Sequence, residues 1–450
     1  MENVKYNIAI IGGGPAGYTA ADVAGKAGLS VVLFEKQNVG GVCLNDGCIP
    51  TKTLLYSAKT YDSARHASKY GVNVSDVSFD LSKIIARKTR IVRKLVLGVK
   101  AKLTSNRVTL IQGEAFIINP NTVRCSEKVY ECESMIVCTG SETFIPPIQG
   151  IETVPYWTHH EALDNKELPA SLTIIGGGVI GMEFASFFNS LGVQVTVIEM
   201  TEEILGSTDK ELSAMLRCDY AKRGVNFLLN TNVLEVSQTG EEISVLYENA
   251  GETGSVISER LLMSVGRRPV TQGFGLENLN LEKTGYGCIK VDDRMQTSCP
   301  HVYVCGDLTG FSLLAHTAVR EAEVAVHAIL GKEDNMNYHA VPGVVYTNPE
   351  IAGTGETEET LQEKGITYKV SKLPMTYAGR FTVENEGVNG LCKILSGEDD
   401  VILGVHLLGN PASELITLAC MAIELKLTSS TWKKTIFPHP TTGEIFKECL

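Results

Sequence analysis

Two segments of the sequence repeat one strand–turn–helix–strand plan, and this repeat constrains the fold more than any other feature. In the first copy, an apolar run enters GGGPAG at residues 12–17 and the next apolar run ends at Glu35. In the second, an apolar run enters GGGVIG at residues 176–181 and the next one ends at Glu199. Each glutamate lies 23 positions after the first glycine of its motif. One such glycine motif is weak evidence, but two in register predict two dinucleotide-binding βαβ modules.

The spacing within each motif gives the physical reason for this prediction. The first glycine permits a tight turn, the second lets backbone N–H groups approach a pyrophosphate, and the third lets the helix pack on the strand. The phosphate then rests at the positive end of the helix, and the glutamate accepts hydrogen bonds from ribose hydroxyls. The residues expected in these roles are Gly12, Gly14, Gly17 and Glu35 in the first copy, and Gly176, Gly178, Gly181 and Glu199 in the second.

Two cysteines five positions apart, Cys43 and Cys48 in GGVCLNDGCIPTK, follow the first copy closely. In a regular helix such residues have Cα atoms about 8 to 9 Å apart, whereas a disulfide needs about 4.4 to 6.8 Å. If the two cysteines bond, the helix must be distorted between them, and Gly47 supplies the backbone freedom. The alternative is a pair of unbonded buried thiols. The glycine loop before the pair and the Pro-x-Lys after it favour a redox pair beside the ligand of the first module.

Composition excludes several classes of partner and location. A chain of 450 residues is too long for one hydrophobic core and is expected to form about two to four domains. Its net charge of −12 argues against nucleic acid and anionic membranes as partners. We find no export signal and no apolar run near the ~18 residues of a membrane span, and the cysteines are too sparse for a secreted disulfide scaffold. These features predict a reducing, cytoplasmic location.

The other cysteines show no zinc-ligand spacing with a nearby histidine, so no metal site is predicted. Nine of them are expected to be small buried or half-buried side chains: Cys125, Cys132, Cys138, Cys218, Cys288, Cys299, Cys305, Cys392 and Cys420.

The order of motifs along the whole chain resembles that of the flavoprotein disulfide reductases, most closely the members that oxidise dihydrolipoyl groups. The matching motifs are GGGPAG, GGVCLNDGCIPTK, TGS, GGGVIGMEFA, VGRRP, VYVCGD, LAH, YTNPEIAGTGETEE and HPTTGE. The resemblance implies an α/β fold with two Rossmann-like domains, one for FAD and one for NAD, and an α+β C-terminal dimerisation domain. The expected boundaries are residues 1–145 with 267–338 for the FAD domain, 146–266 for the NAD domain and 339–450 for the dimer interface.

The resemblance also implies which residues contact the cofactors. Those expected at FAD are Glu35, Lys52, Ala115, Ser141, Asp307 and Ala315, with Asp307 binding the ribityl chain of the flavin. Glu183 matches a family glutamate that pairs with the lysine at position 52; without the resemblance, both could be solvated surface charges. Further cofactor-binding residues are Thr139, Gly140, Val179, Ile180, Val233, Gly266, Leu314 and His316.

The resemblance assigns the catalytic roles as well. Cys43 is the thiol that exchanges with a substrate dithiol, and Cys48 is the thiol beside the flavin. A free thiol is mostly protonated at neutral pH, so a base is required, and His439 is the candidate. Glu444 would fix its tautomer. In the family the C-terminal domain forms the dimer interface and presents this histidine to the disulfide of the other subunit, so a homodimer is expected.

The second strand end favours NAD over NADP, because it carries Glu199, Glu202 and Glu203 with no arginine before Gly206. The 2′-phosphate of NADP would therefore lie beside carboxylates, and we expect no positive charge nearby to compensate it. The main rival is a related NAD(P)H-dependent reductase of glutathione or mercuric ion. A mercuric reductase would end in a paired cysteine tail, whereas only Cys449 lies near this end. From another class, a nucleotide-binding redox sensor would not need the thiol pair, base and both nucleotide sites together.

Two departures from the usual pattern of the family concern the surroundings of the reactive groups. Asp46 adds a negative charge beside the thiols, and Pro438 replaces a histidine often found just before the base. The expected partner is the dihydrolipoyl group of a lipoyl-domain protein in a 2-oxo acid dehydrogenase, acetoin or glycine-cleavage type complex. The sequence does not choose among these complexes.

Overall fold

The computed structural model describes residues 4–450, whose contacts divide them into two compact units. The first unit comprises the described residues up to Thr53 with residues 85–144 and 267–337, and the second comprises residues 54–84, 145–266 and 338–450. One predicted βαβ module lies in each unit. Within residues 4–450 no helix is both long enough and apolar enough to span a bilayer.

The first unit is built on a seven-stranded sheet in which the central strands run parallel. The strand order is β3-β2-β1-β6-β5-β4, and β16 also pairs with β6. Strands β4 and β5 are antiparallel to their neighbours. The strands are β1 (Val4–Ile11), β2 (Val31–Glu35), β3 (Thr109–Gln112), β4 (Ala115–Asn119), β5 (Thr122–Cys125), β6 (Lys128–Val137) and β16 (Val302–Val304). The remaining pair is β7 (Ser141–Thr143) with β15 (Arg267–Pro269).

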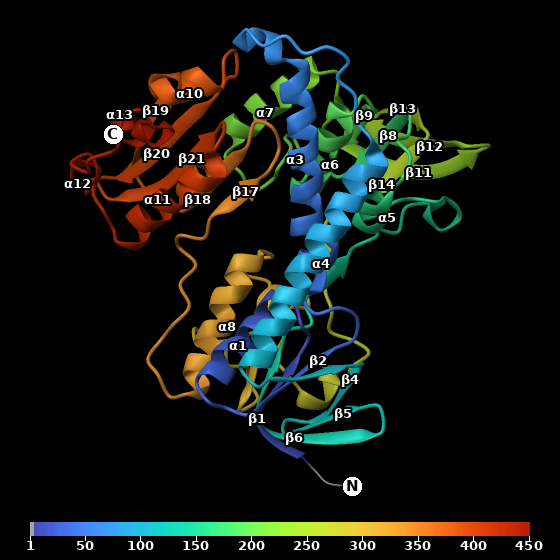
Figure 1. The fold of residues 1–450 in the computed structure, drawn as a ribbon, viewed down its shortest axis with the longest axis vertical. Helices are drawn as coiled ribbons and strands as arrows, with labels where there is room; N and C mark the ends of the chain where they lie inside the picture. Colours follow the sequence, from blue (N-terminus) through green and yellow to red (C-terminus); the bar gives the residue numbers. More distant parts are fainter. Residues whose placement is uncertain (1–3) are drawn as a thin grey trace. The chain divides into compact units, whose positions relative to one another are not determined.

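The continuous apolar run of β1 follows from burial on both faces of this sheet. Ile8 and Ile10 enter the core shared with helix α1 (Pro15–Lys26) and helix α8 (Ala315–Ile329), which pack side by side (Figure 1). Ala9 and Ile11 enter a second core on the opposite face. This alternation is the period-two pattern of a strand with apolar surroundings on either side.

Helix α2 (Gly41–Asp46) belongs to the first unit, whereas α3 (Cys48–Arg65) and α4 (Leu81–Ser105) have residues in both units. Short 3₁₀ helices in these parts of the chain are Ala67–Tyr70, Leu276–Leu279 and Gly306–Leu308.

The second unit contains the other module as a four-stranded parallel sheet in the order β10-β9-β8-β14. Its strands are β8 (Ser171–Ile175), β9 (Gln194–Ile198), β10 (Asn226–Leu228) and β14 (Arg260–Met263), and its helices are α5 (His159–Asp164), α6 (Val179–Ser190) and α7 (Lys210–Lys222). A three-stranded antiparallel sheet follows, formed by β11 (Thr231–Thr239), β12 (Glu242–Asn249) and β13 (Glu252–Ser258).

The C-terminal part of this unit is an antiparallel sheet in the order β17-β18-β21-β20-β19. Its strands are β17 (Gly343–Val345), β18 (Ile351–Gly355), β19 (Tyr368–Pro374), β20 (Leu391–Gly397) and β21 (Ile402–Leu408). Its helices are α9 (Glu358–Glu363), α10 (Gly379–Glu384), α11 (Ala412–Glu424), α12 (Ser429–Trp432) and α13 (Ile445–Cys449). Trp432 and Phe446 stack in its core with ring centroids 5.0 Å apart. The fold class predicted from the sequence is thus confirmed.

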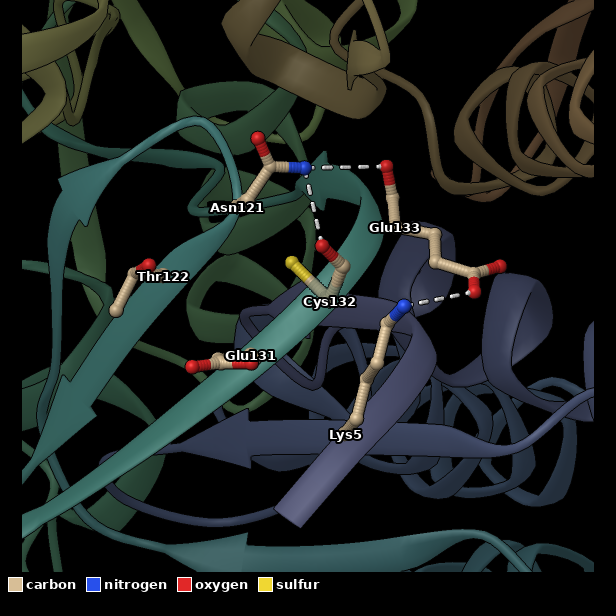
Figure 2. A pocket seen from close by; sticks show the side chains of 6 residues that line it. All are labelled: Lys5, Asn121, Thr122, Glu131, Cys132 and Glu133. Atoms are coloured by element: carbon tan, nitrogen blue, oxygen red, sulfur yellow. Dashed lines mark hydrogen bonds and ion pairs between the residues drawn. The ribbon is translucent and has the colours of Figure 1, made fainter. Parts of the chain in front are cut away.

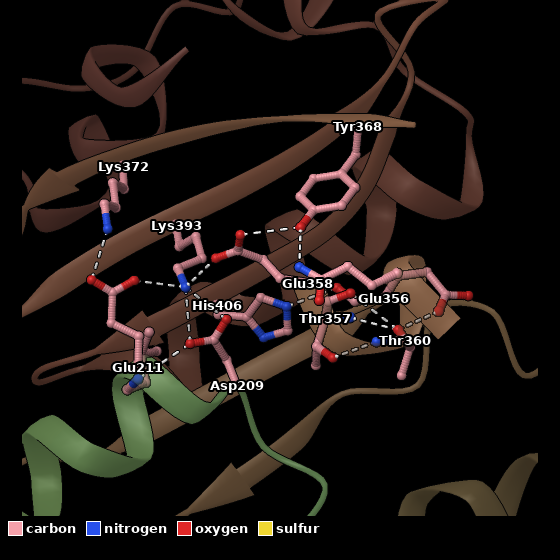
Figure 3. A network of polar contacts seen from close by, with 12 residues as sticks. Asp209, Glu211, Glu356, Thr357, Glu358, Thr360, Tyr368, Lys372, Lys393 and His406 are labelled. Carbon is pink, nitrogen blue, oxygen red and sulfur yellow. Dashed lines mark hydrogen bonds and ion pairs between the residues drawn. The ribbon is translucent and has the colours of Figure 1, made fainter. Parts of the chain in front are cut away.

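A buried lysine joins the nucleotide-binding module to this C-terminal sheet within the second unit (Figure 3). Lys393 on β20 is 2% exposed, and its Nζ lies 2.9 Å from Asp209, 2.7 Å from Glu211 and 2.7 Å from Glu358. Burial opposes the charge of this lysine, but hydrogen bonds to the three carboxylates outweigh it and raise the pKa of Lys393 above its ordinary value. Asp209 also caps α7 by accepting a hydrogen bond from the Leu212 N–H.

Candidate active site

Cys43 and Cys48 form a disulfide, with their Cα atoms 4.7 Å apart. The predicted break in the helix is present, because α2 ends at Asp46 and α3 begins at Cys48. Gly47 between them has φ −142° and ψ −106°, far from helical values. Asn45 holds the turn before the disulfide by donating a hydrogen bond to the Gly41 carbonyl at 2.9 Å. The close approach of the two cysteines therefore depends on ending one helix and starting another.

The first glycine motif forms a cradle that fits a dinucleotide phosphate. A Cβ at Gly17 would lie only 1.8 Å from the Gly12 carbonyl oxygen, so glycine is needed where helix and strand meet. Glu35 accepts a hydrogen bond from the Gly13 N–H at 2.7 Å, which brings its carboxylate to the turn. Gly14 is the N-cap of α1, and no side chain in the described part of the chain caps this helix start. The first N–H groups of α1 are thus available to a phosphate.

The loops that follow β6 and β16 bring together residues far apart in sequence. Ser141 Oγ donates a hydrogen bond to Asp307, and it accepts one from Arg267 Nε at 2.7 Å. Arg267 also donates to the Ser141 carbonyl at 2.6 Å, and burial lowers the pKa of its guanidinium while Asp307 opposes this shift. Thr139 Oγ1 donates to the Val270 carbonyl at 2.9 Å. Two predicted residues, Ser141 and Asp307, are therefore in contact, whereas Arg267 was not predicted.

The position of Asp307 is supported by a second residue that sequence reasoning missed. Glu321 on α8 is fully buried, and its carboxylate accepts a hydrogen bond from the Gly306 N–H at 2.6 Å. Glu321 also accepts one from Thr309 Oγ1 at 3.3 Å. The sequence did carry a signal for Glu321, namely a carboxylate on an otherwise apolar helix face. A buried carboxylate needs hydrogen-bond donors, so such a residue points to a specific contact.

The second glycine motif repeats the geometry of the first within the other unit. A Cβ at Gly181 would lie 2.0 Å from the Gly176 carbonyl oxygen. Glu199 accepts a hydrogen bond from the Gly177 N–H at 2.7 Å. Gly178 is the N-cap of α6, and among residues 4–450 no side chain caps it, while a Cβ there would meet nothing within 4 Å. Both modules can therefore hold a dinucleotide in the same way.

Nearby cations balance the two other carboxylates after β9, Glu202 and Glu203, which corrects one expectation. Glu202 forms an ion pair with Lys210, and Glu203 accepts a hydrogen bond from Arg217 Nε at 2.8 Å. The expectation that nothing nearby compensates these charges was wrong, since both cations come from α7 further along the chain. Glu199 thus remains the carboxylate of this segment that lies at the glycine turn.

His439 and Glu444 lie together near the C-terminus. The Nδ1 of His439 is 2.8 Å from Glu444 Oε1, while Glu444 Oε2 accepts a hydrogen bond from the Thr441 N–H at 2.8 Å. That N–H, together with His439, holds the pKa of Glu444 below its usual value. The His439 side chain is 79% exposed, so its other ring nitrogen is accessible to a reacting group.

The remaining predicted residues occupy the two units as follows. Lys52 lies on α3 in the first unit, and Glu183 lies on α6 in the second, where it is 3% exposed and accepts a hydrogen bond from the Tyr346 N–H at 3.1 Å. Their pairing stays a prediction. Ala115 begins β4, while Leu314, Ala315 and His316 surround the start of α8. Gly140 precedes β7, Val179 and Ile180 open α6, Val233 lies on β11, and Gly266 precedes β15.

One surface hollow of about 250 Å³ lies at the opposite end of the first sheet from the glycine turn (Figure 2). It is lined by Lys5, Asn121, Thr122, Glu131, Cys132 and Glu133. Lys5 and Glu133 form an ion pair at 3.4 Å there. Because ligands of doubly wound sheets bind at the carboxyl ends of the strands, this hollow is not the cofactor site.

Over residues 4–450 there is no cluster of His, Cys, Asp and Glu that could hold a metal ion. A separate prediction concerned the burial of nine cysteines, and one of the nine departs from it. Eight of the nine cysteines expected to be buried or half-buried are so, but Cys218 is exposed on α7. That expectation was wrong because Cys218 occupies the solvent face of an amphipathic helix, while Leu216 and Tyr220 face inward.

The chain matches two family profiles that together cover most of its length. Residues 6–322 match the pyridine nucleotide-disulphide oxidoreductases, and residues 341–450 match the dimerisation domain of the same family. The dihydrolipoyl dehydrogenase of Geobacillus stearothermophilus is 36% identical over 98% of this chain and 94% of its own length. That of Thermus scotoductus is 39% identical over 98% of this chain and 95% of its own length.

Solved structures agree with these sequence matches. The HOCl-induced flavoprotein disulfide reductase RclA from Escherichia coli, solved as a Cu(II) complex, has a TM-score of 0.88 and 30% identity, covering 100% of this chain and 99% of its own. LpdA from Mycobacterium tuberculosis has a TM-score of 0.90 and 27% identity, covering 99% of this chain and 98% of its own.

Proposed function

We propose that this chain, which belongs to the pyridine nucleotide-disulphide oxidoreductase family, oxidises a protein-bound dihydrolipoyl group and reduces NAD. The observation that carries the proposal is the Cys43–Cys48 disulfide, which lies half-buried at a break between two helices beside a dinucleotide cradle. The full-length likeness to two dihydrolipoyl dehydrogenases supports the choice of substrate. The family is one of flavoproteins that use FAD and a pyridine nucleotide.

The thiol chemistry follows from this disulfide. A thiolate of the substrate dithiol attacks Cys43 Sγ, which breaks the Cys43–Cys48 bond and leaves Cys48 as a thiolate. The second substrate thiol then attacks the mixed disulfide, which releases the oxidised substrate and Cys43 as a thiol or thiolate. The substrate loses two electrons, and the enzyme disulfide gains them.

His439 is the proposed base for this exchange. Its ring can take a proton from the substrate thiol, and Glu444 at 2.8 Å orients the ring and stabilises the protonated form. The high exposure of His439 suits a base that must reach a substrate outside its own domain. We propose that it serves the disulfide of the other subunit in a homodimer, in keeping with the dimerisation domain at residues 341–450.

The two cradles fit the proposed cofactors. The first would hold FAD through Gly12, Gly14, Gly17 and Glu35, with Ser141 and Asp307 as further polar contacts. The second would hold NAD through Gly176, Gly178, Gly181 and Glu199. When bound, FAD supplies the transfer of two electrons from the reduced cysteines to the nicotinamide. The division at residues 145, 266 and 338 into FAD, NAD and interface domains stays a prediction, as does the cytoplasmic location.

NAD is the proposed nucleotide because of Glu199. Its carboxylate lies at the turn where the adenosine ribose would bind, so it can accept ribose hydroxyls but would repel a 2′-phosphate. Glu202 and Glu203 contribute little to this preference, since Lys210 and Arg217 balance their charges. Arg217 is itself held by Glu203, so it is not placed to receive the phosphate in this arrangement.

The proposal is tested by steady-state kinetics of the flavin-loaded protein with alternative substrates. Dihydrolipoamide with NAD should give rapid NADH formation. Glutathione disulfide or mercuric ion with NADH or NADPH should give little turnover. Faster turnover of either rival substrate would replace this proposal with a reductase of that substrate.

A further inference from the structure

Helix α4 is strongly basic in a chain that is acidic overall. Its 25 residues contain no aspartate or glutamate, while the whole chain has a net charge of −12. The basic residues of the helix are Lys83, Arg87, Lys88, Arg90, Arg93, Lys94, Lys100 and Lys102. Such a local reversal of charge attracts acidic partners although the protein as a whole repels them.

The packing of α4 decides which of these side chains face solvent. Val96, Val99 and Leu103 pack against the core beneath α1 and α8, which fixes one stripe of the helix inward. The residues on the outer side are exposed. We define the basic face of α4 as Arg90, Arg93, Lys94, Leu97 and Lys100, all of which are exposed. Leu97 is 56% exposed among these cations.

The cations of this basic face are not balanced by neighbours. Across residues 4–450, no carboxylate forms an ion pair with any of its four cations, whereas Lys83 and Lys102 at the two ends pair with Asp80 and Asp22. The positive charge of the face is therefore presented to solvent. A set of uncompensated like charges on one helix is destabilising by itself, because neighbours at i,i+4 repel. Arg90 and Lys94 are such a pair.

The basic face begins about one turn after Arg87, a residue that contacts the redox-active segment. Arg87 Nη1 donates a hydrogen bond to the Thr53 carbonyl at 3.0 Å, and Thr53 lies in the second turn of α3, which Cys48 opens. All these residues belong to the first unit. From Arg90 to Lys100, the two ends of the basic face, the helix rises about 15 Å. A domain of about 100 residues has a radius of gyration of about 13 Å. The face is thus comparable in length to this radius, which suits a contact with one small domain.

We propose that the basic face of α4 is the docking surface for an acidic carrier domain that brings a protein-bound dithiol to Cys43–Cys48. This inference rests on the proposed function, because only a substrate carried on a protein needs such a surface. The cations steer the acidic domain toward the disulfide and hold it in a weak encounter, and Leu97 supplies the apolar contact at its centre.

Other occupants of this face are less consistent with the charges. In a two-fold dimer formed through this face, the basic face of one copy would contact the basic face of the other, which would place cations against cations. A nucleic acid would meet the repulsion of the rest of the chain, and the helix offers no aromatic side chain for stacking.

The test compares a carried substrate with a free one. The flavin-loaded enzyme is assayed with free dihydrolipoamide, which is uncharged, and with a reduced lipoylated domain of net negative charge. The variant is the double charge reversal Arg93→Glu with Lys94→Glu. The matched control is Lys128→Glu with Lys166→Glu, two exposed lysines away from α4 that change the net charge equally.

We expect the α4 variant to lose about tenfold or more in kcat/KM for the lipoylated domain, within the range that electrostatic steering supplies. Its kcat/KM for free dihydrolipoamide should stay unchanged, and the control should keep both activities. In the unmutated enzyme, raising the ionic strength from about 0.02 M to about 0.3 M should lower kcat/KM for the lipoylated domain but not for free dihydrolipoamide. The reason is that the Debye length shortens, which weakens electrostatic steering.

Three results would overturn the docking proposal. If the variant turns over both substrates as the unmutated enzyme does, docking fails while the proposed function stands. If the variant instead changes the oligomeric state in light scattering, the face is an interface between copies. If the unmutated enzyme does not oxidise free dihydrolipoamide, the proposed function fails and the docking proposal with it.

Discussion

Replacing Lys393 by Met should destabilise the second unit by about 3 kcal/mol, since removing one partner of a buried ion pair typically costs 3 to 5 kcal/mol. Lys393 is 2% exposed and is the common partner of three carboxylates. The value lies at the low end of the range for a structural reason. Glu211 and Glu358 are 38% and 27% exposed, so water can solvate them once the lysine is gone. Asp209, 1% exposed, carries most of the penalty.

Tryptophan fluorescence during urea unfolding is a suitable assay, because both tryptophans, Trp157 and Trp432, belong to the second unit. The control is Lys372→Met, which removes a cation that is 51% exposed and pairs with Glu211 at 2.8 Å. An exposed pair of this kind contributes about 0 to 1 kcal/mol. Similar losses in the two variants would refute the reasoning.

A double variant tests whether the uncompensated charge of Asp209 causes the loss of stability in Lys393→Met. Asp209→Asn added to Lys393→Met removes the uncompensated charge but keeps an acceptor for the Leu212 N–H, so it should restore part of the stability. A double variant that is no more stable than Lys393→Met alone would contradict the charge explanation.

Four further predictions concern the chemistry, the nucleotide and the acid limit. Cys48→Ser should keep FAD bound yet lower dihydrolipoamide turnover by orders of magnitude, and near-normal turnover would exclude the relay. His439→Gln should keep the fold and both cofactors and lose about 10²- to 10⁴-fold in dihydrolipoamide oxidation, whereas retention within about threefold would remove it from the mechanism. The unmutated protein should prefer NAD to NADP by about 10²-fold, and Glu199→Arg should narrow or invert that ratio at constant flavin content. Hydrogen bonding to Arg320 lowers the pKa of Asp334 to about 2, but solvent screens this partly exposed pair, so Asp334→Asn should cost about 1 kcal/mol at pH 7 and progressively less as the pH falls below about 4, as acid-titrated urea unfolding would show.

The parts of the site that the sequence predicted are those set by local spacing. The distance between Cys43 and Cys48 required a helix break, and Gly47 provides it. The glycine motifs with Glu35 and Glu199 required only a strand, a turn and a helix in order, and both glutamates bond to their turns.

The parts that the sequence could not predict depend on contacts between distant segments. Arg267 lies 126 residues from Ser141, and nothing in the spacing indicates that its guanidinium bonds to that hydroxyl. The ion pairs of Glu202 and Glu203 were missed because their partners come from the next helix. Cys218 was misplaced because a cysteine can occupy either face of an amphipathic helix.

The central claim is that a dihydrolipoyl dithiol reduces the Cys43–Cys48 disulfide. The most direct measurement is to treat the flavin-loaded enzyme anaerobically with an equimolar amount of dihydrolipoamide, alkylate it, and map the modified cysteines by peptide mass spectrometry. We predict that Cys43 and Cys48 become alkylated only after this treatment, and that adding NAD before the alkylating reagent returns both to the protected state. If the two remain protected with dihydrolipoamide alone, or if only other cysteines gain label, the account is contradicted.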